Sequence, residues 1–217
     1  MVIVGGMRDP VVLTMLGQSY TASELEIPFY LPKFMGTGVL GVKIHSTILR
    51  AYADQNNFQV SEEELKEFCR LQTPTAEEMG TKSIPSHLFE ETWAEWQKDE
   101  SEDGMQKFAA AELEAWKYQK SFFDRYGGRV GVREMVTPLA FDAMIAYLAE
   151  REAAGDFAIH DRKLRALFWK WTRKPREPLV SEEEGRVAFA EHPAERWKRA
   201  MLKKMRSLDR KGRPPDS

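Results

Sequence analysis

Cysteine and clustered histidine, the residues that most often mark a chemical site, are scarce in this sequence. It has one cysteine, Cys69, and four histidines that are widely separated along the chain. A single cysteine excludes an internal disulfide and is typical of a reducing compartment. The histidines form no HExxH motif and have no CxxC pair beside them, so no metal site is predicted. We find no catalytic constellation and expect no cofactor; a non-enzymatic role is favoured, and an enzyme with a dispersed site is kept as an alternative.

A long apolar run and a strong charge of either sign are also missing. No stretch approaches the roughly 18 uncharged apolar residues of a membrane span, so no contact with the membrane interior is expected. The first ten residues lack the basic region and apolar run of a signal peptide, and we therefore expect a cytoplasmic protein. The formal net charge is -2, from 32 basic and 34 acidic residues. No global field therefore draws the protein to nucleic acid or to an anionic membrane.

What the sequence does contain is a helical pattern with clear helix starts. A short apolar strand at 11–16 meets a turn at Gly17, and two capping boxes follow, at Thr21–Glu24 and Ser61–Glu64. Between them we expect a glycine hinge at 36–38 and an amphipathic helix. The apolar residues of that helix recur at helical spacing and are expected to face inward. They are Val39, Leu40, Ile44, Ile48, Leu49 and Tyr52.

The remaining chain predicts further helices joined by short loops. The first three helices are expected at 88–96, at 105–126 after an acidic loop (98–104), and from the Thr137–Pro138 start to Gly155, with a short strand at 130–132 before the third. Two capped helices are expected from Asp161 and Ser181, then a last helix after Pro193 and a disordered basic tail. The predicted fold is mainly α, a multi-helix bundle with a short N-terminal strand element. We divide it into a strand-plus-helix region (1–72), a helical region (73–178) and C-terminal helices with the tail (179–217).

Residues 11–71 resemble the N-terminal, peptide-binding region of SurA-like and PrsA-like chaperones. The resemblance rests on the strand, Gly17, the Thr21 capping box, the long Leu- and Ile-rich helix and the Val60–Leu65 helix start. It implies a helical cradle that holds unfolded or extended polypeptide. The family often continues into a parvulin-type prolyl isomerase domain with a histidine pair and glycine-rich strands. Residues 72–217 have a helical pattern instead, so no isomerase activity is expected.

A cleft for a client polypeptide is predicted where prolines and glycines interrupt the helical pattern. Apolar side chains near Pro28, Pro32 and the 36–38 glycines have fewer regular neighbours and are expected to be exposed for binding. These candidates are Phe29, Tyr30, Phe34, Met35 and Leu40. The ten methionines of the chain add flexible side chains that can repack around different sequences. We therefore expect the partner to be a client polypeptide or a partner protein.

An uneven distribution of charge supports a second hypothesis. Residues 162–176 hold seven basic and no acidic side chains, and a further basic stretch covers 196–213. Trp169 and Trp171 lie among the basic residues of the first stretch, an arrangement that supports base stacking on nucleic acid. Trp171, however, falls on the apolar face of its helix, which indicates a core position. A nucleic-acid-associated helical protein is therefore the less favoured alternative.

Overall fold

The computed structural model describes residues 9–25, 35–73, 75, 102–133 and 137–212. Within them the chain is mainly α-helical with short strands, as the sequence predicts. The chain divides into two compact units, each made of two separate segments: unit 1 is 1–57 with 141–176, and unit 2 is 58–140 with 177–217. In the described part of the chain, no helix has the length and apolar character needed to cross a membrane.

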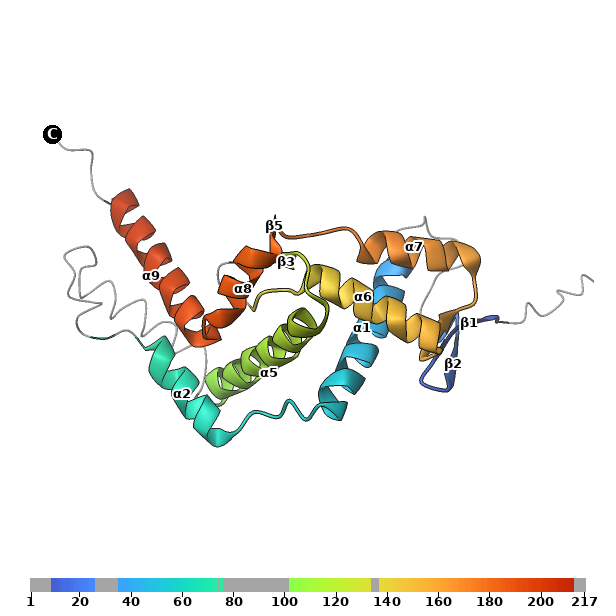
Figure 1. Cartoon of the computed structure of the whole chain (residues 1–217), viewed down its shortest axis with the longest axis horizontal. Helices are drawn as coiled ribbons and strands as arrows, with labels where there is room; N and C mark the ends of the chain where they lie inside the picture. The colour runs from blue at the N-terminus through green and yellow to red at the C-terminus, as the bar shows by residue number, and fades with distance from the viewer. Residues whose placement is uncertain (1–8, 26–34, 74, 76–101, 134–136, 213–217) are drawn as a thin grey trace, which may run out of the picture. The chain divides into compact units, whose positions relative to one another are not determined.

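Unit 1 combines a small antiparallel sheet with three of the described helices. Its elements are β1 (Val11–Met15), β2 (Gln18–Thr21), α1 (Met35–Gln55), α6 (Phe141–Ala154), β4 (Phe157–Ile159) and α7 (Arg162–Thr172) (Figure 1). The strand order is β2-β1-β4, and β1 is paired on both sides. Leu13 pairs with Ile159 and Met15 with Phe157, and all four side chains are buried. The sheet thereby joins the two chain segments of unit 1.

The predicted turn between β1 and β2 is present, one residue earlier than the Gly17–Gln18 position expected from the sequence. Leu16 and Gly17 are its two central residues, with φ angles of 50° and 79°. Positive φ at both positions matches the right-handed twist of a two-stranded hairpin. The reciprocal bonds of the first capping box are also present, because Thr21 N donates to Glu24 Oε2 (2.7 Å) and Glu24 N to Thr21 Oγ1 (3.4 Å). Most of the helix expected after this cap lies outside the described residues.

Helix α1 confirms the predicted inner face and corrects the predicted hinge. Leu40, Ile44, Ile48 and Tyr52 are buried, and Leu49 is half-buried. The prediction is wrong for Val39, which is 45% exposed because it lies on the opposite side of the helix from Ile44 and Ile48. The hinge expected at 36–38 is wrong, because α1 begins at Met35 and runs through both glycines. A helical glycine costs only about 1 kcal/mol relative to alanine. The buried face that begins at Leu40 can offset that cost, so the helix extends beyond the segment that periodicity alone defines.

Unit 2 is built around helices from distant parts of the sequence. Its elements are α2 (Glu62–Gln72), α5 (Glu102–Tyr126), β3 (Val130–Gly131), β5 (Leu179–Val180), α8 (Glu182–Ala190) and α9 (Pro193–Gly212) (Figure 1). Phe68 of α2, Ala109 and Leu113 of α5 and Ala194 of α9 form one buried cluster. The two short strands pair antiparallel, with Val130 opposite Val180. Cys69, in α2, is half-buried.

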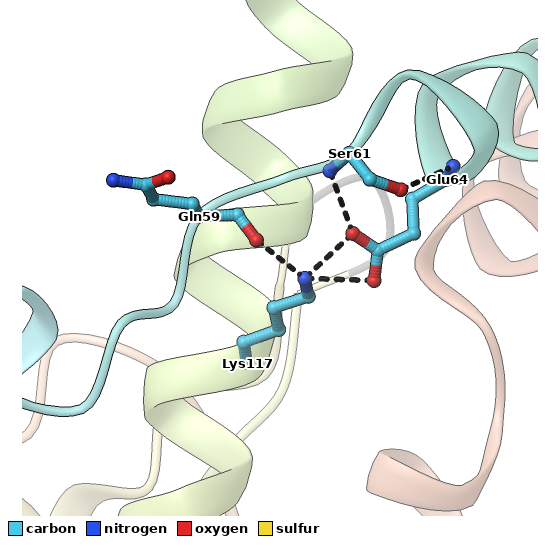
Figure 2. A network of polar contacts seen from close by, with 4 residues as sticks. All are labelled: Gln59, Ser61, Glu64 and Lys117. Carbon is cyan, nitrogen blue, oxygen red and sulfur yellow. Dashed lines mark hydrogen bonds and ion pairs between the residues drawn. The ribbon is translucent and has the colours of Figure 1, made fainter.

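The predicted start of α2 is held by a polar network that also connects α2 to α5 (Figure 2). Ser61 accepts from the backbone of Glu64, and the Glu64 carboxylate accepts from the backbone of Ser61, which completes a capping box. Lys117 Nζ of α5 donates to Glu64 Oε2 at 2.7 Å and to the Gln59 carbonyl at 2.8 Å, and it forms an ion pair with Glu64 Oε1 at 2.7 Å. Burial alone raises the pKa of Glu64, but the Lys117 ammonium and the Ser61 donors outweigh it and lower that pKa. The carboxylate is therefore a charged structural link.

Two other helix starts differ from the prediction. Helix α5 begins at Glu102, inside the segment predicted as an acidic loop. Helix α6 begins at Phe141 and not at the Thr137–Pro138 cap. Thr137 instead donates from its backbone and hydroxyl to Glu112 of α5, and the Leu139 backbone pairs with Gly131. These tertiary bonds hold the predicted first turn in an extended form.

The compact units do not follow the consecutive regions proposed from the sequence. Helix α2, which the sequence analysis groups with the N-terminal strand, belongs to unit 2. Helices α6 and α7, from the middle of the chain, complete unit 1 with β4 between them. Turn and cap signals locate single elements, whereas long-range strand and helix pairing decides which unit each element joins.

Candidate functional site

The predicted peptide-binding residues are only partly within the described structure. Phe29, Tyr30 and Phe34 lie outside the described residues. Met35 is the first residue of α1, and nothing is described of its side chain. Leu40 is 0% exposed, so the expected exposure is wrong for this residue. Its position on the inner face of α1 accounts for its burial.

The outer face of α1 carries two exposed valines, one of which, Val39, the sequence analysis predicts on the inner face. Val39 is 45% exposed and Val42 is 60% exposed, three residues apart on the same side of the helix. Farther along this side, Ser46 and Arg50 are exposed polar residues, as expected of a solvated helix face. We call Val39 and Val42 the α1 valine face. The signal that could have found it is the helical repeat itself, since at about 100° per residue Val39 and Val42 lie opposite Ile44 and Ile48.

The inner face of α1 packs closely against α7. His45 lies edge-on to the rings of Trp171 and Phe168, with ring centroids 5.3 Å and 6.0 Å away. Its Nε2 atom is 3.3 Å from the Thr172 hydroxyl. Burial, with a smaller contribution from the positive charge of Arg176, lowers the pKa of His45 to about 4. His45 is therefore neutral at pH 7, and its contacts are those of a packing residue.

A shallow groove of about 620 Å³ lies between α6 and α7 of unit 1. We call it the α6–α7 groove; its lining residues are Ala149, Glu152, Ala153, Arg165, Ala166, Trp169, Lys170 and Arg173. Glu152 accepts two hydrogen bonds from Arg165, at 2.7 and 2.6 Å from Nε and Nη2, and a third from Trp169 Nε1 at 3.0 Å. These three hydrogen bonds from α7 to one carboxylate of α6 fix the position of the two helices relative to each other. The charged lining makes this groove a candidate binding surface.

The structure argues against stacking of nucleic-acid bases on the tryptophans of 162–176. Trp169 is 8% exposed, its Nε1 is bonded to Glu152, and the Arg173 guanidinium lies over its ring at 5.1 Å. Trp171 packs against α1, and the Arg176 guanidinium lies 4.4 Å from its ring centre. Both rings are engaged within the protein, so the described part of this segment offers charge without a free ring for stacking.

In the second basic stretch, 196–213, two of the described arginines are paired with a glutamate. Arg196 is buried and donates to the Ala188 carbonyl at 2.7 Å. Arg199 lies 2.7 Å from Glu191 Oε1, and Arg196 lies 3.5 Å from the other Glu191 oxygen. Burial, the largest effect, lowers the pKa of Arg196 even though Glu191 raises it. These arginines link α8 to α9, which is a structural role.

Histidine and acidic residues form no metal cluster in the part of the chain that the structure describes. His192 accepts a hydrogen bond from the Ala194 backbone through Nδ1 at 3.2 Å, and burial lowers its pKa despite nearby glutamates that raise it. His160 Nε2 lies 2.8 Å from the Thr14 hydroxyl at the sheet. His87 lies outside the described residues. The described histidines thus have packing or hydrogen-bonding partners and do not converge on a common site.

Comparison with known proteins adds no relative to these observations. No protein-family model, curated protein or solved structure matches the chain. The resemblance of residues 11–71 to SurA-like and PrsA-like chaperones therefore stays a prediction of the sequence. The two surfaces of unit 1, the α1 valine face and the α6–α7 groove, are the geometric basis for a function.

Proposed function

We propose that this protein binds polypeptide, as a chaperone-like or accessory factor, and that the α1 valine face forms part of the contact surface. The observation that carries the proposal is the exposure of Val39 and Val42 at the start of an otherwise polar outer face. Isolated exposed apolar residues are normal on protein surfaces. Here two of them share one helix face, directly after the segment that contains Phe34 and Met35.

The resemblance to SurA-like proteins supports a client in extended form. Such a client would place apolar side chains against the valines and against the neighbouring candidates Phe29, Tyr30, Phe34 and Met35. Leu40 has a supporting role in this proposal, because its burial fixes the orientation of α1. The single cysteine supports a reducing, cytoplasmic setting for the client. The proposed activity is holding, with no chemical step on the client.

The test measures binding of a fluorescein-labelled, uncharged apolar peptide by fluorescence anisotropy. Each valine that becomes covered contributes roughly 1 kcal/mol at about 25 cal/mol per Å². The double variant Val39→Ser, Val42→Ser should therefore weaken binding about thirtyfold. Phe34→Ser with Met35→Ser should act in the same direction. Circular dichroism and the thermal midpoint check that each variant folds.

A matched control uses the same substitution at exposed valines elsewhere. Val11 and Val187 are 45% and 70% exposed, and neither belongs to α1. The double variant Val11→Ser, Val187→Ser should leave the peptide affinity within about twofold of wild type, since less than about 0.5 kcal/mol is involved. Equal weakening in both double variants, or no binding by the wild type, contradicts the proposal.

A further inference from the structure

The α6–α7 groove has an excess of positive charge. Arg165, Lys170 and Arg173 line it with one carboxylate, Glu152, which leaves a net charge of +2. Arg165 uses Nε and Nη2 on Glu152 and keeps its Nη1 hydrogens for another acceptor. The exposed side chains of Arg162 and Lys163 extend the positive surface along α7. No ion pair to Lys170 or Arg173 occurs among the described residues.

The groove is preformed and has room for a peptide backbone. Ala149 and Ala153 of α6 and Ala166 of α7 give it small side chains between the cationic ones. The bonds of Glu152 to Arg165 and Trp169 fix the two helices and hold Arg165 in place. A volume of about 620 Å³ falls within the roughly 300–1,000 Å³ of ligand-binding clefts. A fixed site loses little conformational entropy when a ligand enters.

The lining favours carboxylates over nucleic acid. Trp169 is the single aromatic residue among the described lining side chains, and its indole N–H and one face are already engaged. Single-stranded nucleic acid usually gains much of its affinity from stacking on free rings. Guanidinium groups, by contrast, bind carboxylates through paired N–H donors. Charge and shape therefore match an extended acidic peptide.

We propose that the α6–α7 groove binds an acidic segment of a polypeptide. This inference rests on the proposed polypeptide-binding function and specifies it, because it assigns carboxylate-rich clients to a second surface of unit 1. Arg173 and Lys170 bind the carboxylates, and Arg165, positioned by Glu152, adds a third cationic contact.

The experiment measures anisotropy of a fluorescein-labelled peptide of alternating Glu and Gly with the full-length protein. The variant Lys170→Gln, Arg173→Gln removes two groove cations and should weaken binding about tenfold. The control variant Lys66→Gln, Arg70→Gln changes the net charge equally on exposed positions of α2, and should stay within about twofold. Raising NaCl from about 0.05 to about 0.3 M should weaken wild-type binding, since salt screens exposed charges. Circular dichroism and thermal midpoints verify the fold of both variants.

Further probes separate the alternatives. A Gln-Gly peptide of equal length should not bind, and equal binding of this peptide overturns the proposal. Equal weakening by the groove and control variants also overturns it, because it shows a general charge effect. Single- and double-stranded oligonucleotides with the same net charge as the Glu-Gly peptide are measured as well. If either oligonucleotide binds more tightly than the peptide, and the groove variant loses that binding, the groove is a nucleic-acid site instead.

The two peptides distinguish failure of the groove proposal from failure of the proposed function. The uncharged apolar peptide reports on the α1 valine face, and the Glu-Gly peptide reports on the groove. Binding of the apolar peptide without binding of the Glu-Gly peptide refutes the groove alone. Binding of the Glu-Gly peptide alone, with the expected loss in the groove variant, supports the groove and refutes the valine face. Failure of both peptides refutes both surfaces.

Discussion

A Cβ atom placed on Gly41 would lie 2.6 Å from Cζ3 of Trp171, so α1 and α7 meet at a distance that only glycine permits. The Trp171 indole lies against the α1 backbone at this point, with His45 edge-on to its ring. The Arg176 guanidinium is 4.4 Å from the centre of the same ring. This contact joins the two chain segments of unit 1 and sets how far α7 stands from α1.

Replacement of Gly41 by alanine should therefore destabilise the protein. The added methyl group would force Trp171 to move, and overpacking of this kind costs about 1–3 kcal/mol. Alanine has a helix propensity better than that of glycine by about 1 kcal/mol, so the expected net loss is at most about 2 kcal/mol. Gly38→Ala in the same helix is the control. A Cβ at Gly38 meets no atom within 4 Å, so that variant should gain about 0.5–1 kcal/mol in urea denaturation. Equal effects of the two substitutions would contradict the close contact.

The neutral state of His45 predicts a pH dependence of stability. Its folded pKa of about 4 lies below the 6.5 of an exposed histidine, so protonation is more favourable in the unfolded chain. The stabilising contribution is complete above about pH 6.5 and is lost as the pH falls toward 4. Between pH 7 and pH 5 this effect amounts to about 2 kcal/mol. Carboxylates titrate mainly below this range, so the change in unfolding free energy between pH 7 and pH 5 should report on His45.

His45→Gln isolates that contribution, since glutamine retains a hydrogen-bonding group near Thr172 and has no titration in this range. Urea denaturation at pH 7 and pH 5 gives the change in unfolding free energy for each protein. The wild type should lose about 2 kcal/mol more than the variant over this interval. An identical loss in both proteins would mean that His45 is solvated and titrates normally.

Local signals in the sequence predicted much of the secondary structure. The Ser61 and Ser181 capping boxes are both formed, because each requires only residues within one helical turn. The Asp161 cap also forms, with its carboxylate accepting from the Leu164 backbone at 2.8 Å. The inner face of α1 follows from the helical repeat of its apolar residues. Such features depend on neighbours in sequence and are therefore accessible without a structure.

Long-range features could not be predicted in this way. The pairing of β4 with β1 joins residues far apart in the chain, and β4 has only three residues, too few for a periodic signal. The glycine hinge failed because tertiary packing extends α1. The α6–α7 groove depends on Glu152 meeting Arg165 and Trp169 across two helices, which composition does not reveal. The basic run 162–176 marked the segment, whereas the neighbours of its side chains decide which ligand suits it.

The Lys117 link between α2 and α5 gives a third prediction. Lys117→Met removes the ammonium that contacts Glu64 and the Gln59 carbonyl, and should cost about 1–2 kcal/mol because charge-assisted bonds are lost from partly buried partners. Lys120→Met is the control on the same helix. Lys120 pairs with Asp124 at an exposed position four residues away, where a loss below about 0.5 kcal/mol is expected. Chemical denaturation measures both values.

The pH dependence of the Lys117 effect provides a check. The folded pKa of Glu64 is lowered, so its contribution is present above the ordinary glutamate pKa and is lost as the pH falls through the folded value. The difference in stability between wild type and Lys117→Met should therefore shrink in acid. A difference that stays constant down to about pH 3 would attribute the loss to packing of the lysine side chain instead.

The last prediction separates stability from binding on the two faces of α1. Ile48 is fully buried, so Ile48→Ala should lower the free energy of unfolding by about 2–5 kcal/mol through lost burial and a residual cavity. Val42 is exposed, so Val42→Ala should change stability by less than about 0.5 kcal/mol. Binding of the uncharged apolar peptide should show the opposite order, measured at a temperature where both variants are folded: Val42→Ala weakens it and Ile48→Ala does not. Loss of peptide affinity in folded Ile48→Ala with normal affinity in Val42→Ala would place the client surface away from the valine face.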